Sequence, residues 1–168
     1  MKKIIYSFTL TVFLALLSPM LLSQSNPEYK IEPGKGFKDC MIGDSSDDII
    51  TKFGTPDKND GSYIDFHYKG FEVAVRNGKV STIFLMYRSK TFMTFDGVTD
   101  KKIGFTSTIP EVMRLYGKPS RIGNSIVSEY GTFPGAHEYY LEYNHLGIAF
   151  TFYDNELADI RVCEASEK

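Results

Sequence analysis

The chain has 168 residues, with 19 lysines and arginines against 21 acidic residues, so its formal net charge is −2. This length fits one domain, or two small ones that pack closely. No basic cluster is longer than a pair, and binding to nucleic acid needs concentrated positive charge, so we expect no nucleic-acid partner.

The first 25 residues have the three-part layout of a secretory signal. Lys2 and Lys3 precede an apolar run at 4–22, and small residues fit cleavage after Ser25. The run is nearly long enough to span a bilayer, so an uncleaved anchor is the alternative, and only that would associate the protein with a membrane. No cysteine lies near the cleavage site, as a lipoprotein would need. We predict a signal peptide at 1–25 and a secreted or periplasmic protein.

The segment 26–41 is rich in polar residues, proline and glycine, and it is predicted to be an extended lead-in. A short helix follows it. Ser45 is the candidate N-cap, Gly54 supplies the left-handed residue that ends the helix, and Pro56 prevents the helix from resuming.

Strands are predicted after the helix. Residues 63–68 alternate polar and apolar side chains, turn at 69–70 and return over 71–75. The Asn-Gly pair at 77–78 is a strong hairpin signal, because a type I′ turn needs positive φ at both central residues. It leads into a further strand at 80–87.

The second half of the chain has similar signals in the same order. Thr108 and Gly117 lie 63 positions after Ser45 and Gly54, as the N-cap and the end of a second helix. An Asp-Asn turn at 154–155 follows the same hairpin logic, and a four-residue turn replaces the two-residue turn of the first half. Three strands are predicted, at 138–143, 148–153 and 157–163.

These patterns predict an α+β fold of two tandem repeats, 42–97 and 98–168. Each repeat is a short helical segment followed by an antiparallel β-meander, with the helices on one face of the sheet. The segment 121–136 has no full counterpart in the first repeat. The residues expected to face the core are Ile64, Phe66, Tyr68, Phe71, Val73, Val75, Ile83, Leu85, Tyr139, Leu141, Tyr143, Ile148, Phe150, Phe152, Ile160 and Val162.

A string of Ile-Gly, Ser or Thr, a short helix, aromatic-Gly-x-Pro and a meander occurs at 42–87 and again at 103–163. It resembles the repeat unit of the β-lactamase inhibitor proteins, which carry it in tandem, and of the small SmpA/OmlA-type envelope lipoproteins, which carry it once. The resemblance implies a helix–loop–helix packed on a sheet, and protein binding rather than catalysis. The chain departs from both groups, because it lacks a lipobox cysteine and a disulfide inside each unit.

Two cysteines, Cys40 and Cys163, lie near opposite ends of the chain that follows the predicted signal. An oxidising compartment favours a disulfide between them. Closing so long a loop would contribute about 4–5 kcal/mol in the chain-entropy model. Two free, largely buried thiols are the alternative, and the spacing leaves both open.

The histidines, His67, His137 and His145, lack the context of catalytic or metal-binding residues. No nucleophile elbow is present, and His137 and His145 lie at opposite ends of one predicted strand, too far apart for a single zinc ion. The acidic turn at 57–61 carries its glycine at the wrong position for a calcium loop. We therefore expect no enzymatic activity, no cofactor and no metal.

The outward face of the sheet and the unmatched 121–136 loop remain as binding surfaces. Alternation also places Asp65 and Glu142 on that face. Tyrosine, methionine and arginine are enriched in interface cores, although ordinary strand surface is the alternative explanation. The candidate binding residues are Tyr63, His67, Phe84, Met86, Phe133, Tyr140, Tyr153 and Arg161.

The leading hypothesis is a non-enzymatic module that binds another extracytoplasmic protein through the open sheet face and the 121–136 loop. The alternative is an extracytoplasmic carrier of a small apolar or lipid-like ligand, held between the sheet and the helices. The abundant phenylalanine and tyrosine residues would line such a pocket as readily as they fill a core.

Overall fold

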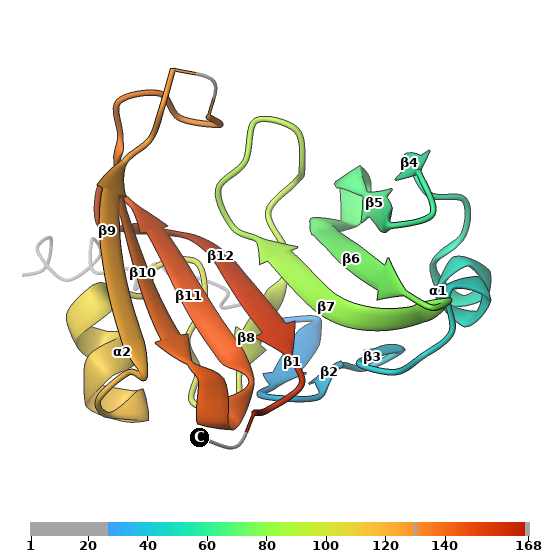
Figure 1. Cartoon of the computed structure of the whole chain (residues 1–168), viewed down its shortest axis with the longest axis horizontal. Coiled ribbons are helices and arrows are strands. Elements are labelled where there is room, and N and C mark those ends of the chain that lie inside the picture. Colours follow the sequence, from blue (N-terminus) through green and yellow to red (C-terminus); the bar gives the residue numbers. More distant parts are fainter. Residues whose placement is uncertain (1–26, 130, 167–168) are drawn as a thin grey trace, which may run out of the picture.

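The computed structural model describes residues 27–129 and 131–166 (Figure 1). The signal peptide predicted at 1–25 lies outside the described residues. Within the described chain, no helix is both long enough and apolar enough to cross a membrane.

The segment expected to be an extended lead-in forms most of a small sheet. β1 (Tyr29–Glu32), β2 (Gly36–Phe37) and β3 (Cys40–Met41) are antiparallel neighbours. β8 (Gly97–Thr99) pairs in parallel with β1, which completes a four-stranded sheet of order β3-β2-β1-β8. β8 therefore spans the boundary expected between residues 97 and 98, and it ties the middle of the chain to its beginning.

The other eight strands form one antiparallel sheet of order β4-β5-β6-β7-β12-β11-β10-β9. Strands β7 and β12 pair directly, so strands from the first and second halves of the chain belong to a single sheet. The strands are β4 (Lys58–Asn59), β5 (Tyr63–Phe66), β6 (Phe71–Arg76), β7 (Lys79–Met86), β9 (Arg121–Ile126), β10 (His137–Tyr143), β11 (Ile148–Tyr153) and β12 (Glu156–Cys163).

Both predicted helices are present and short. In α1 (Ser46–Phe53), the Ser45 hydroxyl accepts a hydrogen bond from the backbone N–H of Asp48 at 3.1 Å, which confirms the expected N-cap. α2 (Ile109–Tyr116) follows Thr108, whose side chain makes no capping hydrogen bond. Gly54 and Gly117 end the helices at φ of 87° and 79°, where a residue with a Cβ would be strained.

Two 3₁₀ turns interrupt the expected strand alternation. They are η1 (His67–Lys69) and η2 (Asn144–Leu146), followed by Gly70 and Gly147 with φ of 74° and 66°. The turns have equal length, so the expected difference of two against four residues is wrong. Tyr68, expected in the core, lies in η1 and is 81% exposed, because the turn rotates its side chain away from the strand period.

The hairpin turns confirm the sequence signals. Asn77 and Gly78 join β6 to β7 with φ of 53° and 73°. Asp154 and Asn155 join β11 to β12 with φ of 50° and 70°. Positive φ at both central residues is what a type I′ turn requires.

The expected fold class is wrong. The described chain is mostly β, with two eight-residue helices and sheets of four and eight strands, rather than an α+β fold of two helix-then-meander repeats. Two features produce the difference. The lead-in forms strands, and the pairing of β7 with β12 makes one continuous sheet.

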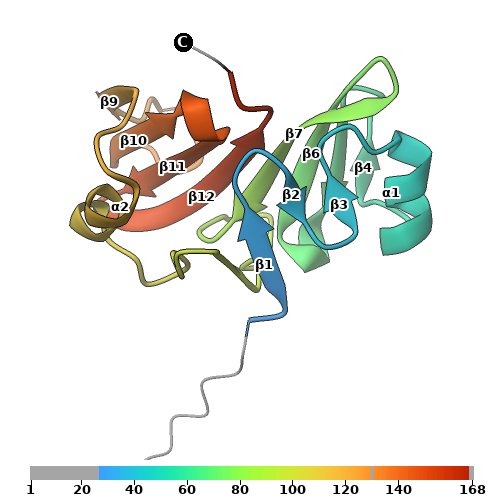
Figure 2. The same ribbon diagram turned by 90° about the horizontal axis from the view of Figure 1, so that it is seen from below.

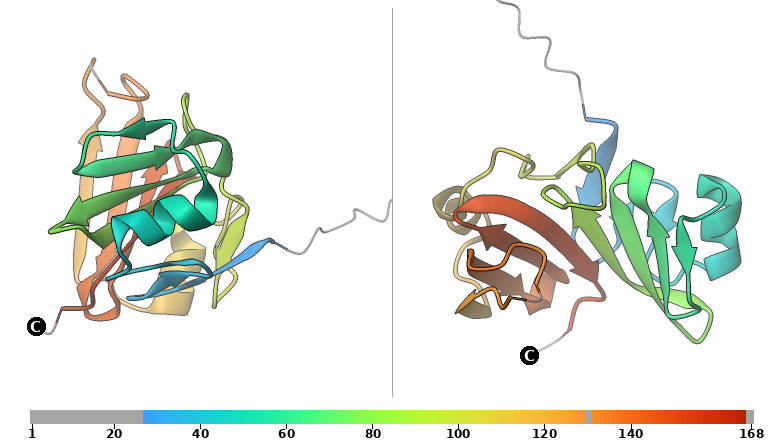
Figure 3. Two further views of the ribbon diagram at one scale, coloured as in Figure 1. Left: turned by 90° about the vertical axis from the view of Figure 1, so that its right-hand side faces the viewer. Right: turned by 90° about the horizontal axis from the view of Figure 1, so that it is seen from above.

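The core lies between the inner face of the large sheet and a layer formed by the small sheet and both helices, which lie on the same side (Figure 2). Figure 3 shows this arrangement from two further sides. Phe37 of β2 packs edge-on against Phe71 of β6 at 5.3 Å between ring centroids. Ile49 from α1 and Val112 from α2 are fully buried. Apart from Tyr68, the residues expected in the core belong to this buried cluster or pack against it.

Candidate binding site

Strand pairing gathers the side chains that point away from the core onto one continuous surface, which we call the outer face. It is turned towards the viewer in Figure 1, on the side opposite the small sheet. Its residues are Tyr63, Asp65, Glu72, Ala74, Phe84, Met86, Tyr140, Glu142, Ala149, Thr151, Asp159, Arg161 and Cys163.

Phe84 of β7 and Arg161 of β12 are cross-strand neighbours at the middle of this face. Nη2 of Arg161 lies 3.0 Å from Oε1 of Glu142, and this ion pair is partly buried. On the other side, Phe84 is the cross-strand neighbour of Glu72 in β6. The centre of the face thus combines a partly exposed aromatic ring with charged side chains on both sides.

Glu72 and Asp65 face each other across β6 and β5. Asp65 is only 6% exposed, and its Oδ1 has no hydrogen-bond partner, whereas Oδ2 lies 3.5 Å from Nε2 of His67. Burial of the Glu72 carboxyl, followed by the nearby charge of Asp65, raises the pKa of Glu72 to about 7. Protonation of Glu72 relieves its repulsion with the neighbouring Asp65 carboxylate.

A second acidic group, Asp159, lies in the row of the outer face that contains Met86 and Thr151. Asp159 of β12 accepts a hydrogen bond from the Thr151 hydroxyl at 3.1 Å. It lies opposite Met86 of β7. Burial raises the pKa of Asp159 to about 6, against the opposing effects of Thr151 and Arg161.

Phe133 packs onto its own protein. Its ring centroid lies 5.3 Å from that of Tyr153, and the Arg88 guanidinium and the Lys90 ammonium lie 4.8 Å and 5.4 Å from its centre. Nη1 of Arg88 also donates to the Tyr153 carbonyl at 2.9 Å and lies 3.0 Å from a carboxylate oxygen of Glu156. The segment expected to be the 121–136 loop begins as the edge strand β9, so its first six residues belong to the large sheet. Phe133, in the part that follows β9, joins this segment to the one after β7, and it is not a freely presented anchor.

Tyr140 also has an internal contact. Its ring lies directly over Gly123 of β9, where a Cβ would overlap ring atoms, and the Arg121 guanidinium lies 5.3 Å from the ring centre. An aromatic ring that covers a glycine of the neighbouring strand is a known way of stabilising an edge strand.

The structure places five of the eight predicted binding residues on the outer face and the other three at its margin. Phe84, Met86, Tyr140 and Arg161 lie in its two central rows, and Tyr63 lies in a further row with 42% exposure. The remaining three lie at the margin: His67 in η1 beside Phe92, and Phe133 with Tyr153 at the end of β11.

Sequence reasoning missed Glu72 and Asp159 as site residues, and it gave no role to Asp65. The signal was available in the strand alternation, because each of these acids stands between inward-facing apolar residues. That Asp65 and Glu72 face each other, however, depends on the register of β5 and β6.

Cys40 and Cys163 are both free, so the possible disulfide is not formed. Cys40 is buried in the core with the small sheet, whereas Cys163 lies on the outer face opposite Thr82. The large sheet separates the two thiols. Burial raises the pKa of both cysteines above its usual range.

A hollow of about 530 Å³ lies at the end of the large sheet, beside the start of α2. Its lining combines buried Tyr87 and Leu157 with exposed Phe105, Asn155 and Glu156, so it opens to the surface. This is not the enclosed cavity that a carrier of an apolar ligand would need. Among residues 27–129 and 131–166, no group of three His, Cys, Asp or Glu side chains is placed to hold a metal ion.

No family model matches the chain, and no curated protein matches its sequence. Among solved structures, the chain is similar to a DUF4309 family protein, YjgB, from Bacillus subtilis, with a TM-score of 0.51 and 12% identity over 78% of this chain and 88% of that one. An extracellular protein containing a SCP domain from Bacillus anthracis gives a TM-score of 0.39 and 12% identity over 73% of this chain and 44% of that one. The first likeness shows a shared fold alone, and the second is too distant to support an argument.

Proposed function

We propose that the protein is a secreted or periplasmic, non-enzymatic module that binds another protein through the outer face. The observation that carries this proposal is the composition of the two central rows, which contain partly exposed Phe84, Met86, Tyr140 and Arg161 on strands β7, β10 and β12 of one sheet. Aromatic, methionine and arginine side chains of this kind form the energetic centres of protein interfaces. Because the paired strands already fix the backbone that carries them, binding a partner needs to order only the side chains.

The 121–136 loop has a different part in this proposal from the one expected. Phe133 is held by Tyr153, Arg88 and Lys90, so the loop forms a rim of the outer face and does not supply its main anchor. A partner that covers the centre would meet this rim at the end of β11.

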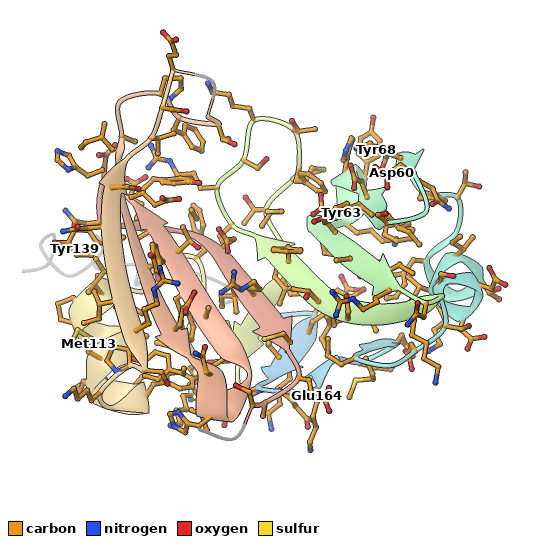
Figure 4. The ribbon with its side chains drawn as sticks, in the orientation of Figure 1. Asp60, Tyr63, Tyr68, Met113, Tyr139 and Glu164 are labelled. Carbon is orange, nitrogen blue, oxygen red and sulfur yellow. The ribbon has the colours of Figure 1, made fainter. Side chains whose placement is uncertain are left out.

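The test is photo-crosslinking from defined positions of the full chain. A photoreactive benzoylphenylalanine is placed at Phe84 in one sample and at Met113 in the other. Met113 is 38% exposed on α2, far from Tyr63 and the β5 end of the sheet (Figure 4). We expect one protein to be crosslinked from position 84 and not from position 113. The same adducts from both positions, or none from position 84, would overturn the proposal.

A further inference from the structure

The carboxylates of Asp65 and Glu72 form a pair on the outer face with unequal access to solvent. Asp65 is more than nine-tenths buried, and its unpartnered Oδ1 is covered, while Glu72 is about half-buried. Asp65 and Glu72 are cross-strand neighbours on β5 and β6. A ligand that approaches the outer face would therefore meet the Glu72 carboxylate first, with Asp65 as a second negative charge behind it.

The charged groups around the pair do not neutralise it. Lys58 of β4 lies opposite Asp65, but its Nζ lies 3.3 Å from Oδ2 of Asp60. His67 of η1 contacts only Oδ2 of Asp65. On the other side of Glu72, β7 presents the uncharged Phe84.

The next cation along the row is Arg161 of β12, beyond Phe84, and it is paired with Glu142 at 3.0 Å. Lys58 lowers the pKa of Glu72 less than burial and Asp65 raise it, so the two carboxyl groups are incompletely compensated. A buried acceptor without a partner costs free energy unless a donor reaches the pair, which is a reason for a ligand to bind here.

We propose that the Asp65–Glu72 pair receives a basic side chain of the protein partner, an arginine guanidinium or a lysine ammonium. This inference rests on the proposed function and names the chemistry of the partner at the same face. Phe84 beside Glu72 offers an aromatic face on which a guanidinium can stack, while its N–H groups donate to the carboxylate. The positive charge replaces the proton of the Glu72 carboxyl, and that proton is released to water.

Cation binding is therefore coupled to pH. With a pKa of about 7, the unprotonated fraction of Glu72 is about one tenth at pH 6 and about nine tenths at pH 8. The affinity for a cation at this site should then rise about tenfold between pH 6 and pH 8. The neighbouring Lys58, Asp60 and His67 are present in every variant used to test this coupling.

The experiment is a titration of the ¹⁵N-labelled full chain with methylguanidinium chloride at pH 6 and pH 8, followed by NMR and corrected with sodium chloride of equal ionic strength. Saturable shifts are expected in the amides of β5 and β6, with a dissociation constant about tenfold lower at pH 8. Glu72→Gln should weaken binding at least tenfold at pH 8 and abolish the pH dependence. Asp48→Asn, which removes one exposed acid on α1, serves as the matched control and should change neither.

Several results would overturn the inference: no saturable shift in β5 and β6, the same affinity in Glu72→Gln, or an equal response to Ca²⁺ or Zn²⁺. A second variant, Asp65→Asn, guards against a local effect of Glu72→Gln and should also weaken binding. The outcome is separable from the crosslinking test. Crosslinking from position 84 without methylguanidinium binding would leave the protein interface standing and remove the basic anchor, whereas the reverse would leave a small-cation site and remove the interface.

Discussion

Phe84 and Arg161 face each other across β7 and β12, where strands of the first and second halves of the chain pair to make one sheet. Arg161 is held from the other side by Glu142 at 3.0 Å. The position at the centre of the proposed interface is therefore created by a pairing between residues far apart in the sequence, and its arginine is oriented before any partner arrives.

Arg161→Ala tests the internal part of this relationship. The Glu142 side chain is only 15% exposed, so loss of its partner should lower the free energy of unfolding by about 1–2 kcal/mol. The double variant Arg161→Ala with Glu142→Gln should recover part of the loss, because no unpaired charge remains. Urea unfolding at neutral pH measures both, and a double variant that is less stable than Arg161→Ala would contradict the account.

Glu72→Gln tests the raised pKa of Glu72 through stability. Burial and Asp65 raise the pKa of Glu72 from 4.5 to about 7, so between these values the folded protein binds more protons than the unfolded chain. Stability then falls as pH rises through this window. Relative to the wild type, Glu72→Gln should gain about 1–2 kcal/mol between pH 5 and pH 8, a figure reduced for the partial exposure of Glu72.

The measurement for Glu72→Gln is chemical unfolding at both pH values, with Asp48→Asn as control. Asp159, whose pKa is raised to about 6, also lowers the free energy of unfolding as pH rises, but over a lower pH range. This effect is common to the wild type, Glu72→Gln and Asp48→Asn. A Glu72→Gln curve parallel to the wild type would show that Glu72 titrates normally.

Phe133→Ala should loosen the junction between the 121–136 loop and the segment after β7. The lost contacts are the ring pair with Tyr153 and the cation–π contacts of Arg88 and Lys90, together worth about 1–2 kcal/mol. Hydrogen exchange should become faster in residues 88–96 and 131–136 and stay unchanged in the core strands. Protection equal to the wild type in both segments would mean that Phe133 does not hold them together.

Gly123→Ala should destabilise the edge of the large sheet, because a Cβ at this position overlaps the Tyr140 ring. We expect a loss of about 1–3 kcal/mol, as for other overpacked positions. Combining it with Tyr140→Ala should cost less than the sum of the two single changes. If the losses of stability measured by thermal unfolding were additive, the Tyr140 ring would not be packed against Gly123.

The thiols provide a test of the fold itself. Cys163 is partly exposed on the outer face, and Cys40 is buried in the core on the other side of the sheet. A thiol reagent at pH 7 should modify Cys163 slowly, since its pKa is raised, and should modify Cys40 only after unfolding. In urea, two free thiols per chain should react. A monomeric chain with no reactive thiol, because its two cysteines form a disulfide, would contradict the separation of the cysteines.

Local features of the fold were predictable because neighbouring residues determine them. Ser45 and Gly54 bound the first helix as expected, and Asn77-Gly78 forms the turn that its φ requirements favour. Tyr68 was misplaced because a 3₁₀ turn, which has no distinct sequence period, interrupts the strand. The two-residue strands β2 and β3 are likewise too short to show alternation.

The candidate site was predictable only in part, for a different reason. Alternation within one strand identifies which side chains leave the core, and this places Phe84, Met86 and Arg161 correctly on the outer face. Which of them meet depends on pairing between distant strands. The raised pKa of Glu72 arises from burial and from Asp65 on the neighbouring strand, and the role of Phe133 arises from Arg88, so neither is visible in a local pattern.

The central claim is that another protein binds the outer face, and the most direct test is the affinity of the crosslinked partner for matched variants. Isothermal titration calorimetry would compare wild type, Phe84→Ala and Met113→Ala at pH 8. The account predicts at least a tenfold weaker affinity for Phe84→Ala, equivalent to about 1.4 kcal/mol, and a change within about twofold for Met113→Ala. Equal affinities for the two variants would contradict it.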